Sequence, residues 1–327
     1  MRYLNVIHGN DYYKLNVEES LVPHNVKEND ILIKVAATGV NRADIYQAEG
    51  SYNPPSGVTD ILGLEVSGEV VEIGKSVTMH EVGDKVCALL RGGGYADYVT
   101  VAEWRALPIP KRMDLVFASA IPEVFATVYL NIFELARLKP METILIHGGS
   151  SGIGTAAIQL AKAFGSKVFV TAGDKEKCKF CEELGADKAI NYKTEDFVSV
   201  VKALNDGKGV DVILDMVGGD YFQKNLKALR VKGRLVCIAF LHGARVEMNF
   251  APLLLKNLTI IGSTLRSRSE KTVHELMQSL RTVVWPLFES GAVNPVIDSV
   301  FDFEDADTAH ARMRGFEHMG KIILRTT

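Results

Sequence analysis

Short apolar runs alternate with helical patterns through the middle of the chain. Residues 143–146 are β-branched and apolar, as expected of a strand covered on both faces. Apolar residues then recur at helical spacing from Ile153 to Ala161. Further strands are predicted at 168–171, 189–191, 210–215 and 234–239, with helices at 175–184, 197–204 and 221–229 between them. This alternation predicts an α/β domain with a doubly wound parallel sheet at residues 124–262.

The chain on either side of this region has a different pattern. Residues 1–123 are rich in predicted strands, at the N-terminus and at 31–35, 64–71, 85–90 and 95–101, with glycine turns between them. They are too strand-rich to continue the alternation and predict a second, β-rich domain. After residue 262 we expect helices at 273–290 and 305–314 and strands at 296–303 and 322–324. We expect residues 263–327 to return to the first domain.

A glycine-rich turn follows the strand at 143–146. From Gly149 the pattern is G-x-S-x-x-G, with Ser151 where a dinucleotide fingerprint usually has its second glycine. We expect Gly149 to allow the turn, Ser151 to let a pyrophosphate reach the backbone, and Gly154 to let helix and strand pack closely. The helix N-terminus would offer unpaired N–H groups to the phosphates. The alternation around the motif favours a Rossmann domain over a glycine-rich loop of another α/β protein.

Composition narrows the class of protein. A net charge of −3, with 47% hydrophobic and 24% charged residues, is ordinary for a soluble globular protein and attracts neither nucleic acid nor an anionic membrane. We find no uninterrupted apolar run near the ~18 residues of a membrane span, and the N-terminus lacks a signal core. Four cysteines make no disulfide framework, and Cys178 and Cys181 are interpreted as two thiols on one helix face. We therefore expect a cytoplasmic protein.

Several segments carry a resemblance to a known family. They are Gly39–Ile45, Asp60–Val70, Gly83–Leu89, His147–Ala161, Asn191–Phe197, Leu265–Arg268 and Gly320–Leu324. Together they resemble the zinc-free quinone oxidoreductases of the medium-chain dehydrogenase/reductase superfamily, nearest to the branch of the tumour-suppressor-induced quinone oxidoreductase. The resemblance covers essentially the whole chain. It implies a GroES-like catalytic domain split around the Rossmann domain, an active-site cleft between the two, and a homodimer.

The residues at the expected zinc position argue against a metal. Zinc alcohol dehydrogenases of the superfamily carry a G-H-E motif where this chain has Gly63-Leu64-Glu65, and a cysteine ligand within the segment matching 39–44, which here holds none. Leucine cannot ligate zinc, and one glutamate with scattered histidines makes no tetrahedral site. We therefore expect no metal. What remains is hydride transfer from a nicotinamide to an acceptor that needs little activation.

The resemblance also implies which residues act. It places Asn41 near the nicotinamide, where its amide N–H could donate to a quinone oxygen, and Tyr46 and Tyr52 along the cleft. Ser151 lies at the phosphate turn, and Thr127 is expected on the nicotinamide side.

Structural roles are also open for some of these residues, and the first is compatible with the functional role. Asn41 could cap a short helix at 42–46, and Tyr52 could be plain packing. Arg42 and Asp44 are interpreted as a structural ion pair rather than as catalysts.

The preferred dinucleotide depends on the end of the second strand. Ala172 stands where alcohol dehydrogenases carry the acid that repels a 2′-phosphate. By resemblance, Lys177 and Tyr192 would bind that phosphate, whereas Asp174 would oppose it. We therefore expect NADPH with a moderate preference. The full set expected around the cofactor is Asn41, Thr127, Gly149, Ser150, Ser151, Gly152, Ile153, Gly173, Lys177, Tyr192, Met216, Val217, Phe240, Leu265, Arg266 and Ser267.

The leading functional hypothesis is an NADPH-dependent quinone reductase working by hydride transfer or in one-electron steps. A reductase of the C=C bond in 2-alkenals or enones would use the same cofactor geometry. A non-catalytic, crystallin-like or RNA-binding protein is the alternative of another class, although the chain has no basic stripe for RNA. The strand at 258–262 could pair with its copy across a dimer axis.

Overall fold

The computed structural model describes residues 1–9, 12–23 and 26–326. It divides into two compact units. The first unit comprises Met1–Ala126 and Arg266–Thr327, and the second comprises Thr127–Leu265. The chain therefore leaves the first unit once and returns to it near Arg266.

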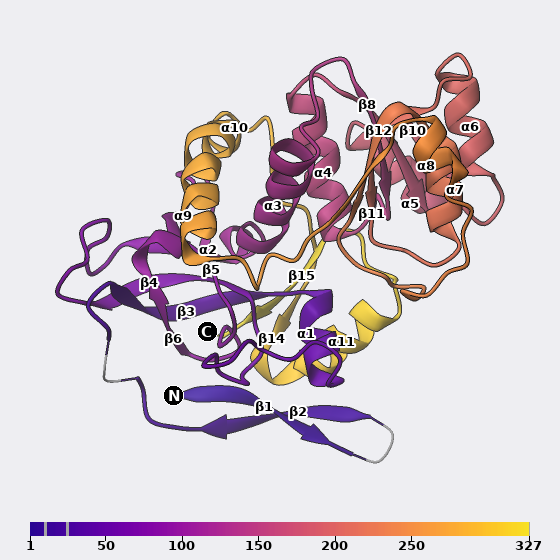
Figure 1. Cartoon of the computed structure of the whole chain (residues 1–327). Coiled ribbons are helices and arrows are strands. Elements are labelled where there is room, and N and C mark those ends of the chain that lie inside the picture. Colours follow the sequence, from indigo (N-terminus) through magenta and orange to yellow (C-terminus); the bar gives the residue numbers. More distant parts are fainter. Residues whose placement is uncertain (10–11, 24–25, 327) are drawn as a thin grey trace. The chain divides into compact units, whose positions relative to one another are not determined.

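The second unit is built on a six-stranded sheet in the order β10-β9-β8-β11-β12-β13, and every neighbouring pair is parallel (Figure 1). The chain runs outward from β8 to β10 and then restarts beside β8 with β11. This reversal is the switch point at which doubly wound sheets bind ligands. The strands are β8 Thr143–His147, β9 Lys167–Ala172, β10 Lys188–Asn191, β11 Val210–Asp215, β12 Leu229–Cys237 and β13 Thr259–Gly262. The doubly wound parallel sheet is confirmed.

Helices connect these strands, and three of them begin at a side-chain cap. Ser151, Asp174 and Asp196 each accept a hydrogen bond from the backbone N–H three residues on. The helices are α4 Gly152–Ala163, α5 Lys175–Glu183, α6 Phe197–Leu204, α7 Tyr221–Ala228 and α8 Ala251–Leu255. The strand predicted at 234–239 instead spans Leu229–Cys237, because the exposed residues 230–232 show no apolar run that would predict its first part.

The first unit contains a seven-stranded sheet in the order β14-β15-β3-β4-β5-β7, with β6 also paired to β3, and a separate β1–β2 hairpin. The last strand, β15, runs antiparallel to β3 with Ile322 opposite Val40. The strands are β1 Arg2–His8, β2 Tyr13–Glu19, β3 Asp30–Val40, β4 Glu65–Ile73, β5 Lys85–Leu89, β6 Tyr98–Ala102, β7 Ala106–Pro108, β14 Ile297–Asp302 and β15 Lys321–Arg325. This is the β-rich, GroES-like fold expected from the sequence.

The helical segments of this unit are short. They are α1 Arg42–Ala48, η1 Glu103–Arg105, α2 Leu115–Ala118, α9 Glu270–Ser279, η3 Leu280–Val284, α10 Trp285–Ser290, η4 Phe303–Asp305 and α11 Ala306–Arg314. The boundary at Ala126 falls within α3 Pro122–Val128, which continues into the second unit as η2 Tyr129–Leu135. The helix predicted at 273–290 is interrupted by a π-helical turn at η3.

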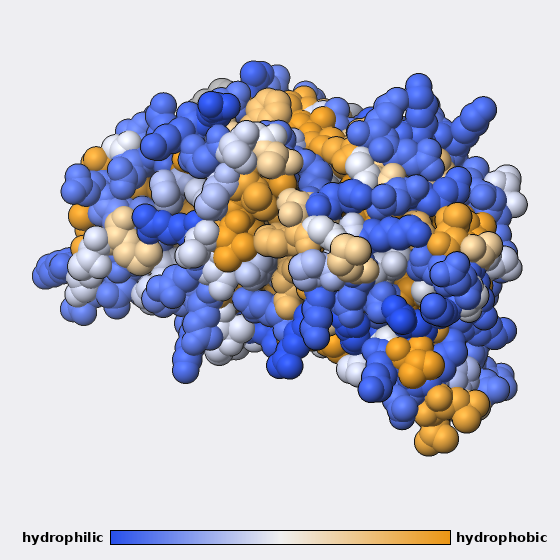
Figure 2. Space-filling view, turned by 90° about the horizontal axis from the view of Figure 1, so that it is seen from above, coloured by the Kyte–Doolittle hydropathy of each residue, from blue (hydrophilic) through white to orange (hydrophobic). Residues whose placement is uncertain are grey.

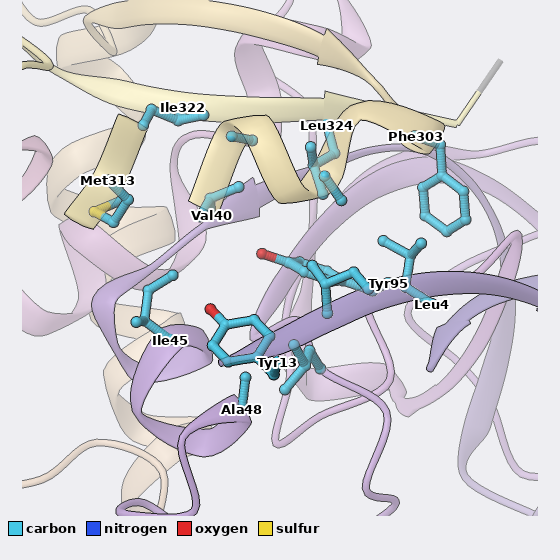
Figure 3. Close-up of a cluster of buried hydrophobic side chains, with 14 residues drawn as sticks. Leu4, Tyr13, Val40, Ile45, Ala48, Tyr95, Phe303, Met313, Ile322 and Leu324 are labelled. Carbon is cyan, nitrogen blue, oxygen red and sulfur yellow. The ribbon is translucent and has the colours of Figure 1, made fainter. Parts of the chain in front are cut away.

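A buried cluster joins the two ends of the chain (Figure 3). Leu4 from β1 and Val40 from β3 pack with Phe303, Ile322 and other residues of the C-terminal segment. Each of these four side chains is almost inaccessible to solvent. Burial of apolar area at roughly 25 cal/mol per Å² explains why the last strand is held beside β3.

The surface is mostly hydrophilic on the face shown in Figure 2, with apolar patches in separate places. One helical stretch, Leu115–Leu135, has the length and apolar composition of a membrane span. Of its most apolar window, 72% is buried inside the protein, which is typical of a core helix.

Candidate active site

The turn after β8 shapes the start of α4. Gly148 has φ +72°, so it is Gly148, rather than Gly149 as predicted, that supplies the left-handed residue of the turn. The Ser151 hydroxyl donates to the Gly148 carbonyl at 2.8 Å and accepts from the Gly154 amide at 3.0 Å. Ser151 therefore holds the turn closed and caps the helix.

Close packing explains the other two glycines. A Cβ on Gly149 would lie 2.6 Å from Cβ of Val170 in β9, and one on Gly154 would lie 2.3 Å from the Gly148 carbonyl oxygen. Both contacts are shorter than side chains allow, so larger residues would push helix and strand apart. The result is a tight, glycine-rich turn at a helix N-terminus, which suits the pyrophosphate of a dinucleotide.

A network of buried, hydrogen-bonded side chains connects the carboxyl ends of the neighbouring strands. His147 bonds Thr171 at 3.0 Å and Asn225 at 2.8 Å, and the Asn225 amide donates to Asp215 at 3.0 Å. Asp215 in turn accepts the Val217 amide at 2.7 Å. Burial lowers the pKa of His147, although Asp215 opposes this. Local sequence patterns do not reveal this network, because its side chains are about 10 to 80 residues apart along the chain.

Two predicted cofactor residues meet at this edge of the sheet. The Met216 sulfur lies 3.9 Å from the Ser151 hydroxyl, and it would lie 3.1 Å from a Cβ on Gly148. The loop after Met216 continues through Val217, whose carbonyl accepts from the amide of His242. Phe240 lies against Gly218 and is half exposed.

The end of β9 brings together the residues expected at the 2′-phosphate. The Tyr192 hydroxyl would lie 2.8 Å from a Cβ on Gly173, so a larger residue at this position would displace the tyrosine ring. The Asp174 carboxylate accepts from the Lys177 amide at 2.8 Å and caps α5. Asp174 is therefore explained by helix capping, a role that the sequence reasoning missed.

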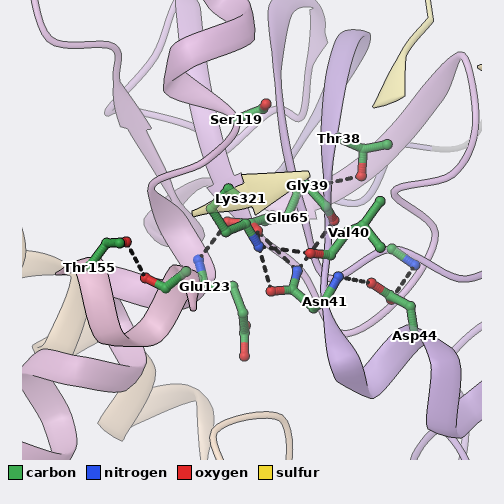
Figure 4. A network of polar contacts seen from close by, with 12 residues as sticks. Thr38, Gly39, Val40, Asn41, Asp44, Glu65, Ser119, Glu123, Thr155 and Lys321 are labelled. Atoms are coloured by element: carbon green, nitrogen blue, oxygen red, sulfur yellow. Dashed lines mark hydrogen bonds and ion pairs between the residues drawn. The ribbon is translucent and has the colours of Figure 1, made fainter. Parts of the chain in front are cut away.

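A buried polar cluster of the first unit surrounds Asn41 (Figure 4). The Lys321 ammonium donates to Asn41 Oδ1 at 2.6 Å and to the Val40 carbonyl at 3.0 Å, and lies 2.7 Å from Glu65 Oε1. Asn41 Nδ2 donates to the same Glu65 oxygen at 2.9 Å. The other Glu65 oxygen accepts from the Glu123 amide at 2.8 Å. The cluster thus pairs one cation with one anion and fixes the orientation of the Asn41 amide.

Glycine is required beside this cluster as well. A Cβ on Gly39 would lie 2.2 Å from Glu65 Oε1. Sequence reasoning assigned Asn41 but missed Lys321, which is 280 residues away along the chain.

Asn41 occupies the N-cap position of α1 and forms a capping box with Asp44, and its side-chain amide also joins the cluster. The Asp44 carboxylate accepts from the Asn41 backbone amide at 2.8 Å and from the Gly63 amide at 3.0 Å. The predicted Arg42–Asp44 ion pair is wrong, because Arg42 donates to the Met313 carbonyl at 2.6 Å. The Asp44 carboxylate bonds these backbone amides and not the guanidinium of Arg42, because the amides belong to the turns that bury it.

Tyr46 and Tyr52 are adjacent in the fold. Tyr46 lies on α1, and its carbonyl accepts from the Tyr52 amide at 3.1 Å. Burial raises the pKa of both phenols. The Tyr52 ring faces Arg266, whose guanidinium carbon lies 5.6 Å from the ring centroid. This contact gives Tyr52 a role beyond plain packing.

The remaining predicted cofactor residues lie at element ends. Ser150 is buried in the turn before α4, and Gly152 and Ile153 form the first turn of that helix. The Thr127 carbonyl accepts from the Asn131 side chain at 2.8 Å. Leu265 is buried at the end of the second unit, and Ser267 is exposed in the first.

Within the described residues, no group of three or more histidine, cysteine, aspartate or glutamate side chains could hold a metal ion. Cys178 and Cys181 are both free. Burial raises the pKa of Cys181 to about 12, so this thiol is neutral at physiological pH.

Comparison with known proteins places this site in a family. Residues 27–111 match the family model described as alcohol dehydrogenase GroES-like domain, and residues 152–281 match the one described as zinc-binding dehydrogenase. Quinone oxidoreductase of Rattus norvegicus is 31% identical over 99% of this chain and 97% of its own length. Human quinone oxidoreductase is 30% identical over 91% of this chain and 89% of its own length.

Solved structures of related proteins support the same family. The quinone oxidoreductase of Escherichia coli complexed with NADPH has a TM-score of 0.88 and 28% identity, covering 99% of each chain. CurK enoyl reductase has a TM-score of 0.85 and 26% identity, covering 100% of this chain and 99% of its own. The chain therefore belongs to the quinone oxidoreductase family of the medium-chain dehydrogenase/reductase superfamily, and it is an oxidoreductase.

Proposed function

We propose that this protein reduces quinones with NADPH by hydride transfer and without a metal ion. The observation that carries the proposal is the tight turn of Gly148, Gly149, Ser151 and Gly154 at a helix N-terminus, which leaves no room for side chains at its glycines and is the kind of turn that binds a dinucleotide pyrophosphate. A bound NADPH supplies the hydride, that is, two electrons and one proton. The protein binds and orients both reactants. The NADPH-complexed relative supports this choice of cofactor.

The proposed dinucleotide contacts are given separately for each unit. In the second unit the proposed contacts are Thr127, Gly149, Ser150, Ser151, Gly152, Ile153, Gly173, Lys177, Tyr192, Met216, Val217, Phe240 and Leu265, and in the first unit Asn41, Arg266 and Ser267. Lys177 and Tyr192 would bind the 2′-phosphate, since Ala172 offers no competing acid. Asp174 weakens the preference for NADPH, because its carboxylate lies at the same turn.

On the acceptor side, Asn41 and Tyr52 would orient the quinone. The second Asn41 Nδ2 hydrogen makes only a long bond of 3.3 Å, to the Gly39 carbonyl, so a quinone oxygen could replace this partner. Tyr52 offers a ring face and a hydroxyl. A quinone oxygen can take its proton from water, so no obligatory protein acid is invoked.

A second candidate is reduction of the C=C bond of enones or 2-alkenals. The similarity to CurK enoyl reductase favours it, because that protein shares the fold over the full length of this chain. The same cofactor position would serve both reactions, so the difference lies in the acceptor. A second copy of the chain is the proposed partner, with β13 as the shared edge, and the cytosol is the proposed compartment.

Turnover of 1,2-naphthoquinone and of 2-hexenal, each with NADPH and with NADH, separates these possibilities. We expect the quinone with NADPH to give the highest kcat/KM. A higher kcat/KM with 2-hexenal would favour the enone reductase, and absence of turnover with intact NADPH binding would reject both. Detection of a one-electron product by paramagnetic resonance would replace hydride transfer by single-electron steps.

The roles of Asn41 and Tyr52 have their own test. If both only orient the acceptor, Asn41→Ala and Tyr52→Phe should each retain activity well above the ~10⁴-fold loss that removal of an essential acid–base group causes. A larger loss in either variant would identify that residue as a proton donor.

A further inference from the structure

Arg266 is a buried cation whose two terminal nitrogens have no protein partner. The residue is 6% exposed. Its Nε donates to the Arg91 carbonyl at 2.6 Å, while Nη1 and Nη2 are buried and unbonded. Among the ion pairs of the described chain, none includes Arg266. A buried charged donor without a partner lowers the stability of the fold, because its lost hydration is not replaced. Such groups in native proteins usually mark a functional requirement.

The surroundings of Arg266 restrict what could meet these nitrogens. The Tyr52 ring lies alongside the guanidinium, with 5.6 Å from ring centroid to guanidinium carbon. Nη2 would lie 3.3 Å from a Cβ on Gly92, so a side chain at that position would crowd it. Burial lowers the pKa of Arg266, and Arg91 adds to this, whereas Tyr52, Asp44 and Glu123 oppose it. Arginine nevertheless stays protonated in proteins.

We infer that the Nη1 and Nη2 pair of Arg266 is a binding site for a planar, negatively charged oxygen group on the acceptor. A guanidinium fork matches a carboxylate or a delocalised enolate or phenolate oxygen better than any neutral group. The inference rests on the proposed function and assigns the side chain of Arg266 to the acceptor, so that the dinucleotide contact proposed for this residue would be made by its backbone.

The chemistry explains why such a site is useful. Addition of a hydride to a quinone or to an enone leaves the acceptor with one negative charge on its conjugated oxygen. The reduced nicotinamide loses those two electrons and that proton, and the oxygen later takes a proton from water. Fixed donors near a developing oxyanion lower the barrier by far more than they would in water. Arg266 would thus stabilise charge without transferring a proton.

The first test measures binding and not turnover. Benzoate and the neutral, similarly shaped benzamide are titrated calorimetrically into the full chain, with and without NADP⁺. We expect wild type to prefer benzoate by about 10-fold or more, the range of charge-assisted hydrogen bonds. Arg266→Met should abolish this preference, and Arg266→Lys should keep part of it. Arg281→Met, which removes an exposed cation on η3, is the matched control and should behave as wild type.

Equal binding of benzoate and benzamide to wild type, or an unchanged preference for benzoate in Arg266→Met, would contradict the proposed binding site at Arg266. So would an NADPH Kd raised more than about 10-fold in Arg266→Met with benzoate binding intact, since Arg266 would then serve the dinucleotide. In turnover, we expect Arg266→Met to lower kcat by about 10²-fold. If wild type discriminates benzoate but reduces no acceptor, the proposed function fails and the anion site stands.

Stability separates a binding role from a structural one. Methionine at this position removes an unpaired buried charge, so Arg266→Met should unfold at an equal or higher urea concentration than wild type. A clearly lower midpoint would show that Arg266 holds the fold together, and would contradict the inference.

Discussion

The ammonium of Lys321 lies 2.7 Å from Oε1 of Glu65, and the two side chains are 4% and 0% exposed. This ion pair sits where the segments matching a zinc site of related dehydrogenases come together. Asn41, in the segment that matches the cysteine ligand, accepts from Lys321 and donates to Glu65. A cation of the protein itself thus neutralises the buried carboxylate.

Removal of the cation should destabilise the first unit strongly. Lys321→Met leaves Glu65 buried without its ion-pair partner, and breaking a buried pair in this way costs about 3–5 kcal/mol. Urea unfolding measures the loss. The control is Lys179→Met, which breaks the exposed Lys179–Glu183 pair and should change stability by less than about 0.5 kcal/mol.

A double variant tests whether the stranded charge is the cause. Glu65→Gln combined with Lys321→Met removes both charges and keeps an acceptor for the Asn41 amide. It should recover more than half of the stability that Lys321→Met loses. A double variant as unstable as Lys321→Met would show that the lysine acts through packing instead.

Asp174 should limit the preference for NADPH. Serine at this position keeps a helix cap for α5 and removes the carboxylate. One unit charge near a solvent-exposed phosphate is worth about 1 kcal/mol, so the NADPH-to-NADH ratio of kcat/KM should rise roughly 5-fold in Asp174→Ser. Lys177→Ala should move the ratio the other way. A ratio that stays constant in Asp174→Ser would place the carboxylate away from the phosphate.

Asp298 should make stability depend on pH in the acid range. Burial raises its pKa, but hydrogen bonds from Arg312 at 2.6 and 2.9 Å and from the Met319 amide outweigh burial and lower the pKa to about 2. A lowered pKa means stabilisation that is complete above the unfolded value of 3.8 and is lost as pH falls toward 2.

Comparison of wild type with Asp298→Asn by urea unfolding measures this contribution. The difference in free energy of unfolding should be about 2 kcal/mol above about pH 5 and roughly half of that near pH 3. The control is Asp302→Asn, which breaks the exposed Asp302–Arg325 pair and should change stability by less than about 0.5 kcal/mol. A pH-independent difference for Asp298→Asn would contradict the lowered pKa.

Strand β13 should form the dimer interface. It is hydrogen-bonded only to β12 and lies at the edge of the sheet, with Ile260 36% exposed. An unprotected edge pairs readily with its own copy. Size-exclusion chromatography of Ile260→Lys should show a monomer and that of wild type a dimer. Met141→Lys, which changes a side chain 90% exposed elsewhere on the second unit, should remain dimeric. Monomeric wild type would remove the proposal.

Local patterns predicted the elements of the second unit well, because each buried strand is a short β-branched run between turns. They placed β11 at 210–215 and α6 at 197–204, as the structure has them. They missed the start of β12, where residues 230–232 are exposed and show no apolar run. They also failed for Asp44, because its partners, the amides of Asn41 and Gly63, are backbone groups that sequence patterns do not reveal.

The sequence by itself determined the two kinds of domain, the glycine-rich turn after β8 and the absence of histidine and cysteine at the positions that match zinc ligands, since these depend on spacing and residue type over short stretches. Only the tertiary structure brought Lys321 to Glu65 and Arg266 to Tyr52. The return of the chain to the first unit creates both relationships, and their energies depend on burial, which is a property of the folded chain and not of any local segment.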